Sequence, residues 1–299
     1  MKSDVIAVVV TYNRKELLLQ CIRCLQGQTK EGLEILIVDN ASTDGTEQAL
    51  LPFMESKAIT YVNTGANLGG AGGFQFGLNH ACKSGHEYIW MMDDDSAPEP
   101  DALEKLIAAA EELGHFGYLS GKTLWTDGSL CKMNIQRDTR LAPIKDFRES
   151  IIPSGAATFV SLLIPRTVIR QIGLPIGEFF IWADDLEYTR RISRMYPCYV
   201  VVDSITVHHC ETNNGGNIAT DAPSRIDRYR YAYRNEVYLY RREGVQGIVH
   251  LLLRTPLHIF RVLIKSKDCR LRRIRTILAG TLDGLSFKPS IEYPDPEQH

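Results

Sequence analysis

Three consecutive aspartates, Asp93-Asp94-Asp95, carry the clearest chemical signal in the chain. They follow Tyr88–Met92, an apolar run that predicts a buried strand. Neighbouring carboxylates repel one another, and a bound cation offsets that repulsion. Side chains alternate along an extended backbone, so Asp93 and Asp95 should point to the same side. The pattern favours a Mg²⁺ or Mn²⁺ site, which takes hard oxygen ligands, over a solvated acidic loop.

Polar residues also follow the three strands that we predict earlier in the chain. Ligands of open α/β sheets bind outside the carboxyl ends of the strands. Four such loops in succession therefore predict one site along a single edge of the sheet. The three earlier loops are Thr11-Tyr12-Asn13-Arg14 after Val5–Val10, Asp39-Asn40-Ala41-Ser42 after Glu34–Val38, and Asn67–Gly73 after Ile59–Asn63.

The glycine-rich segment Asn67–Gly73 does not match a dinucleotide-binding fingerprint, because Gln75 stands where G-x-G-x-x-G needs its last glycine. The segment Ser120–Thr123 resembles the end of a P-loop, but Phe116 replaces the required first glycine. The glycines at 69–73 either let the backbone approach a ligand closely or only form a turn before a helix.

Two further pairs of residues are candidates for catalysis or metal binding. Asp184-Asp185 follow an aromatic run and open a predicted helix, where a carboxylate can serve as a general base or simply cap the helix. His208-His209 follow a strand-like run, and one of them could supply a third ligand to the metal, although such pairs are often structural.

Alternating strand and helix patterns position these residues. Helical spacing predicts helices at Lys15–Gln26, Thr46–Phe53 and Gly73–Lys83, and Pro98 and Pro100 introduce another that ends at Leu113. This alternation predicts an α/β fold with a mostly parallel central sheet and helices on both faces. Further strands are expected within 154–164, 199–203 and 205–207.

The charge of the chain is segregated by region. The formal net charge is −2, yet Arg225–Lys288 holds 15 basic and 5 acidic residues and carries +10. No nucleic-acid recognition motif accompanies these basic residues, so we expect no nucleic-acid partner. Seven scattered cysteines do not form a disulfide framework, and Val5–Val10 resembles a first strand more than a signal peptide. We therefore expect a reducing, cytoplasmic location.

The basic region predicts helices with long apolar stretches, Ile248–Leu253 and Leu257–Ile264, flanked by arginines and lysines. Such a helix can lie on an anionic membrane surface. The alternatives are packing on the rest of the chain or self-association into a homo-oligomer.

Several segments together resemble the family 2 glycosyltransferases of the GT-A fold. The segments are Val8–Arg14, Glu34–Gly45, Asn67–Gly73, Asp93–Asp95, Ser154–Arg166 and Phe179–Tyr188, and the resemblance covers roughly residues 4–215. The Asn-Leu-Gly-Gly-Ala-Gly-Gly-Phe loop, the Asp triplet and Trp-Ala-Asp-Asp look most like the galactofuranosyltransferase and rhamnosyltransferase branch.

The resemblance implies a role for each matching residue in a metal-dependent, inverting transfer from a nucleotide sugar. Asp93 and Asp95 would bind Mn²⁺ or Mg²⁺ together with His208, or with His209 as the alternative. Asp185 would be the catalytic base, and Asp184 and Trp182 would bind the acceptor. Trp182 lies one position from where the galactofuranosyl enzymes carry it. The implied nucleotide and donor ligands are Thr11, Tyr12, Arg14, Asp39, Asn67, Gly70, Asp93 and Asp94.

The implied donor is UDP-galactofuranose or dTDP-rhamnose, and the acceptor is a glycan or a lipid-linked glycan of a cell-surface polysaccharide. The enzyme would be cytoplasmic and peripheral on the inner face of the plasma membrane. We expect a GT-A catalytic domain over 1–222, a basic helical region over 223–288 and a disordered tail over 289–299. Within the catalytic domain, about 1–115 would bind the nucleotide sugar and about 116–222 the acceptor. A nucleotidyltransferase and a non-catalytic glycan-binding scaffold are the alternatives.

Overall fold

The computed structural model describes residues 4–295 and forms two compact units. Unit 1 contains the described residues up to Gly177, Asp185–Asn213, and the described residues from Ile291 onward. Unit 2 contains Glu178–Asp184 and Asn214–Ser290. The helical unit thus begins before the expected residue 223 and includes a short segment that precedes Asp185.

Unit 1 is built on a nine-stranded sheet. Its strands are β1 (Val5–Thr11), β2 (Glu34–Asp39), β3 (Thr60–Asn63), β4 (Tyr88–Asp93), β5 (Ser96–Pro98), β6 (Leu119–Trp125), β7 (Ile151–Pro153), β8 (Leu162–Pro165) and β9 (Tyr199–His208). Its helices are α1 (Lys15–Gln26), α2 (Thr46–Glu55), α3 (Gly69–Ala81), α4 (Ala102–Leu113), α5 (Arg166–Ile172) and α6 (Asp184–Ser193, whose first residue belongs to unit 2), with short 3-10 turns at Lys132–Asn134 and Gly177–Phe179.

The strand order is β3-β2-β1-β4-β8-β6-β9-β5, with β7 paired to β9. The neighbours in β3-β2-β1-β4 are all parallel, as the alternating pattern predicts. The strand β8 is antiparallel to both β4 and β6, and β5 and β7 are antiparallel to β9. The fold class is therefore confirmed, while the second half of the sheet is mixed, in the region where the sequence has weak periodicity.

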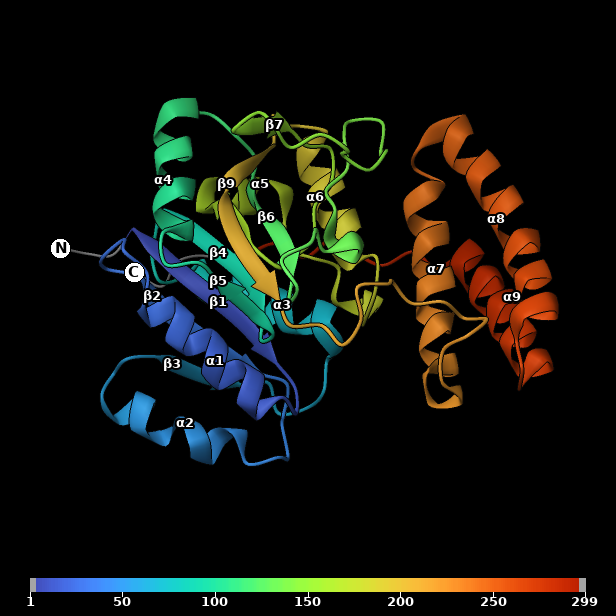
Figure 1. The fold of residues 1–299 in the computed structure, drawn as a ribbon, viewed down its shortest axis with the longest axis horizontal. Helices are drawn as coiled ribbons and strands as arrows, with labels where there is room; N and C mark the ends of the chain where they lie inside the picture. Colours follow the sequence, from blue (N-terminus) through green and yellow to red (C-terminus); the bar gives the residue numbers. More distant parts are fainter. Residues whose placement is uncertain (1–3, 296–299) are drawn as a thin grey trace. The chain divides into compact units, whose positions relative to one another are not determined.

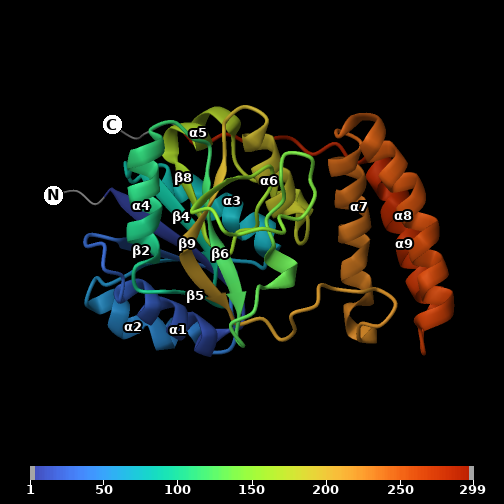
Figure 2. The same ribbon diagram turned by 45° about the horizontal axis from the view of Figure 1, so that its top comes forward.

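The two faces of the sheet are covered by different helices. Val9 and Trp90 pack with α1 and α4 in one apolar core. Val8 and Met91, their neighbours along β1 and β4, pack with α3, α5 and α6 in the other. Figure 2 shows α1 and α2 on one side of the strands and α5 and α6 on the other. Alternation along buried strands thus builds a three-layer α/β/α unit.

The glycines of α3 bring this helix close to the sheet. A Cβ atom at Gly73 would lie 2.5 Å from Val10 Cγ1, and one at Gly77 would lie 2.7 Å from Val8 Cγ1. These glycines are packing residues rather than a phosphate-binding turn. The helix α3 begins at Gly69 and not at the expected Gly73. A Cβ atom at Gly70, by contrast, would meet no atom within 4 Å.

Unit 2 consists mainly of α7 (Tyr229–Tyr240), α8 (Gly244–Lys265) and α9 (Arg270–Ser286), preceded by a 3-10 turn at Pro223–Arg228 (Figure 1). Gly280 and Gly284 let α9 approach α7, because a Cβ at either would lie within 2.6 Å of an α7 atom. The buried guanidinium of Arg273 donates to the carbonyl of Ile218 and, at 2.9 Å, to that of Asp221. The unit therefore has its own packed core.

Residues 291–295, part of the tail expected to be disordered, contain no helix or strand but belong to unit 1 and are held within it. Leu174 N–H donates to the Glu292 carbonyl at 2.7 Å, and Lys83 pairs with Asp295 at 2.7 Å. The rest of the tail expected to be disordered, 296–299, lies outside the described residues.

Candidate active site and metal centre

The carboxyl ends of β1, β2 and β4 bring the first polar loops together. Val10 pairs with Asp93, and Thr11 pairs with Asp39, across adjacent parallel strands. The late strand β9 ends at His208, which pairs with Ser96 directly after the Asp triplet. Residues far apart in the sequence therefore meet at one edge of the sheet, as the order of strands and loops predicts.

Asp93, Asp95 and His208 form a group suited to a cation. One ligand atom from each lies within 4.8 Å of the other two, and His208 Nε2 lies 3.0 Å from Asp95 Oδ1. Asp93 and Asp95 thus contribute to one group, as expected, although the backbone turns at Asp94 and Asp95 instead of continuing the strand β4. Two carboxylates and one imidazole are a donor set that suits Mn²⁺ or Mg²⁺, so the residues present fit the metal that the fold implies.

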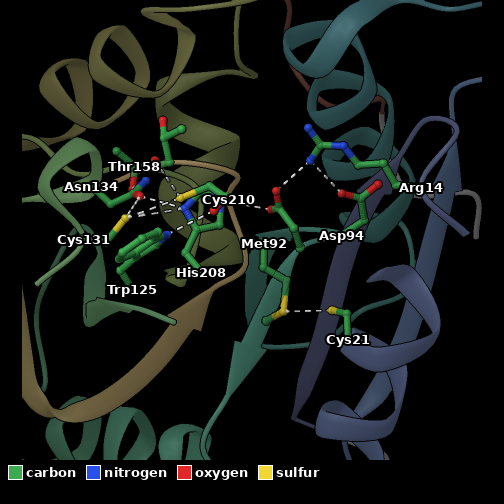
Figure 3. Close-up of polar contacts among 12 residues, drawn as sticks. Arg14, Cys21, Met92, Asp94, Trp125, Cys131, Asn134, Thr158, His208 and Cys210 are labelled. Atoms are coloured by element: carbon green, nitrogen blue, oxygen red, sulfur yellow. Dashed lines mark hydrogen bonds and ion pairs between the residues drawn. The ribbon is translucent and has the colours of Figure 1, made fainter. Parts of the chain in front are cut away.

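Arg14 lies next to Asp94, on the side away from His208 (Figure 3). Its Nη1 is 2.6 Å from Asp95 Oδ2 and 3.3 Å from Asp94 Oδ1. Thr11 Oγ1 donates to Asp94 Oδ2 at 2.7 Å. Thr11 and Arg14, expected at the nucleotide, thus also hold Asp94, which is buried. About half of the Arg14 side chain remains exposed and able to meet an anionic ligand.

The raised pKa values of Asp93 and Asp94 indicate that the cluster has too little positive charge to balance its carboxylates. Burial and the nearby Asp95 carboxylate raise the pKa of Asp93, and burial raises the pKa of Asp94 to about 6. Burial opposes ionisation of Asp95 as well, but the hydrogen bond from His208 holds its pKa below the usual value. The same bond outweighs burial and raises the pKa of His208. A divalent cation would displace the proton of His208 Nε2 and satisfy the carboxylates together.

The other nitrogen of His208 is held by a residue that the sequence analysis missed. His208 Nδ1 lies 2.8 Å from Oδ1 of the buried Asn134. Asn134 Nδ2 donates to Thr158 Oγ1 at 3.0 Å, which fixes the oxygen of the amide towards the imidazole. Nδ1 therefore carries a proton, and Nε2 is the nitrogen directed at the carboxylates. Asn134 lies in a stretch without periodicity, so no sequence signal marked it.

Two thiols lie on the Nδ1 side of the same imidazole. Cys131 Sγ is 3.8 Å from His208 Nδ1 and 3.9 Å from Cys210 Sγ (Figure 3). The three residues could group around a soft metal ion. However, the 2.8 Å bond to Asn134 commits Nδ1 to the amide oxygen. The thiols instead form the wall of the pocket that holds the histidine.

His209, the alternative ligand, points to another neighbour. Its Nε2 lies 3.1 Å from Gln20 Nε2, and its backbone N–H donates to the Asp95 carbonyl at 2.8 Å. The structure therefore places His208 rather than His209 beside the carboxylates.

The remaining nucleotide candidates lie at the ends of β1, β2 and β3. The buried Asp39 accepts hydrogen bonds from Ser42 N–H and from Tyr61 OH, both at 2.8 Å. Tyr61 is a second partner that the sequence analysis did not identify. Asn67 accepts from Gly69 N–H at 2.9 Å and shapes the start of α3, while Tyr12 is exposed.

Asp184 and Asp185 are the first two residues of α6. Asp185 Oδ1 accepts from the N–H of Leu186 at 2.7 Å. Burial raises the pKa of Asp185 to about 6, although that N–H and Arg137 act in the opposite direction. Trp182 lies in unit 2 and packs on Tyr229, with ring centroids 4.8 Å apart.

Comparisons with known proteins show that the chain is similar to glycosyltransferases. Residues 6–141 match the family model Glycosyl transferase family 2. The chain is 28% identical over 271 residues to "Galactofuranosyltransferase GlfT1" of Mycobacterium tuberculosis, covering 83% of this chain and 86% of that protein.

Two solved structures share the fold. "Mannosyltransferase PcManGT from Pyrobaculum calidifontis in complex with GDP-Man and Mn2+" has a TM-score of 0.59 at 16% identity, covering 96% of this chain and 88% of that one. "Crystal structure of S. aureus TarS 1-349 in complex with UDP" has a TM-score of 0.57 at 13% identity, covering 100% of this chain and 98% of that one. The match to a longer chain of S. aureus TarS covers only 44% of that chain. Residues 6–141 therefore form a Glycosyl transferase family 2 domain, in a chain that has the GT-A fold and is similar to a galactofuranosyltransferase along most of its length.

Proposed function

We propose that the protein transfers galactofuranose from a UDP-linked donor to a hydroxyl of a glycan or lipid-linked glycan, in a metal-dependent reaction that inverts the anomeric centre. The observation that carries this proposal is the group of Asp93, Asp95 and His208, whose ligand atoms lie within 4.8 Å of one another at the carboxyl edge of the sheet. A divalent cation bound there would neutralise charge on the departing nucleoside diphosphate.

The side chains of the protein would bind the donor on both sides of this group. Asp39 would accept a hydrogen bond from the imide N–H of the base. The exposed part of Arg14 would face the diphosphate, next to Tyr12, Asn67 and Gly70. Asp94, held by Thr11 at 2.7 Å, would accept hydrogen bonds from the ribose or the donor sugar.

Asp185 would act as the general base. It takes the proton of the acceptor hydroxyl while that oxygen forms a bond to the anomeric carbon. The bond from this carbon to the diphosphate oxygen breaks, and the electron pair leaves with the nucleoside diphosphate. Attack opposite the leaving group inverts the anomeric centre. A pKa of about 6 suits a base that works near neutral pH. Asp184 and Trp182 would bind the acceptor.

Galactofuranose is favoured because the matched relative named a galactofuranosyltransferase covers most of both chains. Rhamnose from dTDP-rhamnose is the second choice, since the same motifs resemble rhamnosyltransferases. A screen of UDP-galactofuranose, dTDP-rhamnose, UDP-galactopyranose and GDP-mannose with Mn²⁺ tests the donor. We expect a metal-dependent rise in melting temperature with UDP-galactofuranose, followed by UDP release in the presence of acceptor. Stabilisation by GDP-mannose alone would contradict the proposal.

An exposed apolar surface on the helix α8 of unit 2 supports the proposal of a membrane-bound acceptor. The helix α8 is long and apolar enough, by length and composition, to cross a membrane, and only 11% of its apolar window is buried. Leu252 and Phe260 are 69% and 60% exposed. Its polar side chains instead turn towards α7, where Arg254 pairs with Glu236 and His258 Nδ1 lies 2.7 Å from Tyr233 OH. The apolar side chains of α8 are thus exposed while its polar side chains are bonded to α7, and this arrangement suits contact with lipid.

Basic residues at the end of α8 and along α9 complement this apolar surface. Lys265, Lys267, Arg270 and Arg275 are exposed beside Leu271, which is 74% exposed. Apolar insertion combined with cationic side chains suits peripheral binding to anionic lipid. The protein would then work from the cytoplasm on the inner face of the plasma membrane.

Flotation with vesicles of phosphatidylglycerol and phosphatidylcholine tests this surface. We expect the wild-type protein and Leu51→Glu, a matched change in unit 1, to float, and Leu252→Glu combined with Phe260→Glu to stay behind. Equal flotation of all three proteins would contradict membrane binding through α8. A concentration-dependent dimer that the α8 changes dissolve, without flotation, would assign the surface to self-association.

A further inference from the structure

The segment before Asp184 is held in an unfavourable backbone conformation. Phe180, Trp182 and Ala183 have φ values of 63°, 68° and 64°. Residues with a Cβ atom rarely adopt this left-handed region, and each such residue costs on the order of 1–3 kcal/mol. A segment that needed only to turn would use glycine at these positions. Retention of two large aromatic side chains indicates that the side chains themselves are needed.

One buried side chain fixes this segment from within the same unit. Asn235 of α7 is fully buried, and its Nδ2 lies 2.9 Å from the Phe179 carbonyl, 3.1 Å from that of Ile181 and 2.9 Å from that of Trp182. The two N–H groups of the amide are thus shared among three carbonyls. Arg234 Nε donates to Asn235 Oδ1 at 3.0 Å and sets the direction of the amide.

Aromatic rings of α7 support the same segment. Trp182 packs on Tyr229 at 4.8 Å, and Phe180 stacks on Tyr231 at 5.0 Å between ring centroids. Arg234 Nη2 also donates to the carbonyls of Glu178 and Phe179. The helix α7 therefore makes contacts with most of Glu178–Asp184, which explains why this short segment belongs to the helical unit.

We propose that Asn235 is a positioning residue for the acceptor: it holds the strained segment in the conformation in which Trp182 and Asp184 bind the acceptor glycan. This inference rests on the proposed function, which assigns those two residues to the acceptor. The amide acts through three main-chain carbonyls and touches no substrate. Its loss should therefore weaken acceptor binding and leave the donor site, built from β1, β2, β4 and β9, unchanged.

The test compares Asn235→Asp with Tyr233→Phe. The first change replaces the donor amide by a carboxylate facing three carbonyls while keeping the shape. The second removes one hydrogen bond, Tyr233 OH to His258, from the same helix without touching the segment. UDP-galactofuranose is the donor and octyl β-galactofuranoside the acceptor probe. Hydrogen exchange of 178–184 and the melting temperature are measured alongside the kinetics.

We expect Asn235→Asp to raise the KM for the octyl galactofuranoside at least tenfold and to speed amide exchange in 178–184. The affinity for UDP with Mn²⁺ should stay within twofold, and Tyr233→Phe should resemble the wild-type protein. An unchanged acceptor KM, or a parallel loss of UDP affinity, would overturn the role of Asn235. A wild-type protein that transfers no sugar to the probe would instead count against the proposed function, and the exchange rates would still show whether Asn235 holds the segment.

Discussion

His208 Nδ1 lies 2.8 Å from Asn134 Oδ1, and this bond directs the opposite nitrogen of the imidazole at Asp95. A partner of this kind orients a metal-binding histidine, and its loss typically costs about 10–100-fold in metal affinity. We expect Asn134→Leu to weaken Mn²⁺ binding by this factor in a titration with UDP present, followed by electron paramagnetic resonance. Asn79→Ala, which removes an exposed asparagine bonded to Asp295, serves as the control. Equal Mn²⁺ affinity in both variants would remove Asn134 from the metal centre.

Removal of the Asp95 carboxylate should abolish metal-dependent binding of the nucleotide. Asp95 contacts both His208 at 3.0 Å and Arg14 at 2.6 Å, so Asp95→Ala deletes a ligand and releases both partners. Calorimetry with UDP should show that Mn²⁺ no longer strengthens binding. Asp101→Ala, which removes an exposed ion pair with Lys105, should behave like the wild-type protein. Unchanged UDP affinity with Mn²⁺ in Asp95→Ala would rule out this ligand.

Asp185→Asn should stop transfer without affecting the donor. General-base catalysis contributes about 10²–10⁴-fold to rate, and the amide cannot accept the proton. We expect kcat to fall by that factor while calorimetric affinity for UDP with Mn²⁺ stays unchanged. Near-normal turnover of a radiolabelled donor would exclude Asp185 as the base.

The pKa of Asp185 sets the direction of the pH dependence. Burial raises this pKa to about 6, and only the ionised carboxylate can accept the proton. Activity should therefore be full above pH 6 and fall as the pH is lowered through it, with kcat/KM for the acceptor dropping about tenfold per pH unit below the pKa. The residual activity of Asp185→Asn should lack this step. A wild-type profile that is flat between pH 5 and 7 would contradict the assignment.

The glycines of α3 can be tested through stability. Alanine at Gly77 would place a Cβ atom 2.7 Å from Val8 Cγ1 and 2.9 Å from Val38 Cγ2. Overpacking of a core typically costs about 1–3 kcal/mol, so we expect Gly77→Ala to lower the free energy of unfolding by that amount in urea. Gly70→Ala meets no atom within 4 Å and should leave stability unchanged or slightly increased. Similar stability of the two variants would show that α3 can shift away from the sheet.

The sequence predicts the parallel half of the sheet well because each strand there is a buried apolar run followed by a polar loop. The sequence also predicts that Asp93, Asp95 and His208 lie close together, because each follows a predicted strand. The antiparallel strands β7 and β8 are short, and their pairing depends on contacts with residues far away in the chain. No local pattern predicts such pairing.

The supporting residues were beyond prediction for a related reason. Asn134 and Asn235 act through side-chain hydrogen bonds to partners as far as 74 and 56 residues away in the chain. A lone asparagine in an irregular segment or a helix carries no sign of such a partner. The glycines at 69–73 suggest either a close approach to a ligand or a turn, and only the structure shows that Gly73 lets α3 pack closely on β1.

Arg14 already supplies one positive charge to Asp95, at 2.6 Å, before any ligand arrives. A dication approaching the same carboxylate meets that guanidinium, and the repulsion between them disfavours binding of the metal alone. A bound diphosphate would draw Arg14 towards its own oxygens and free the carboxylate, so each ligand would remove the obstacle to the other. The two should then bind with positive cooperativity that is equal in both directions. Such an enzyme would hold scarcely any metal between catalytic cycles and would acquire it together with each new nucleotide sugar.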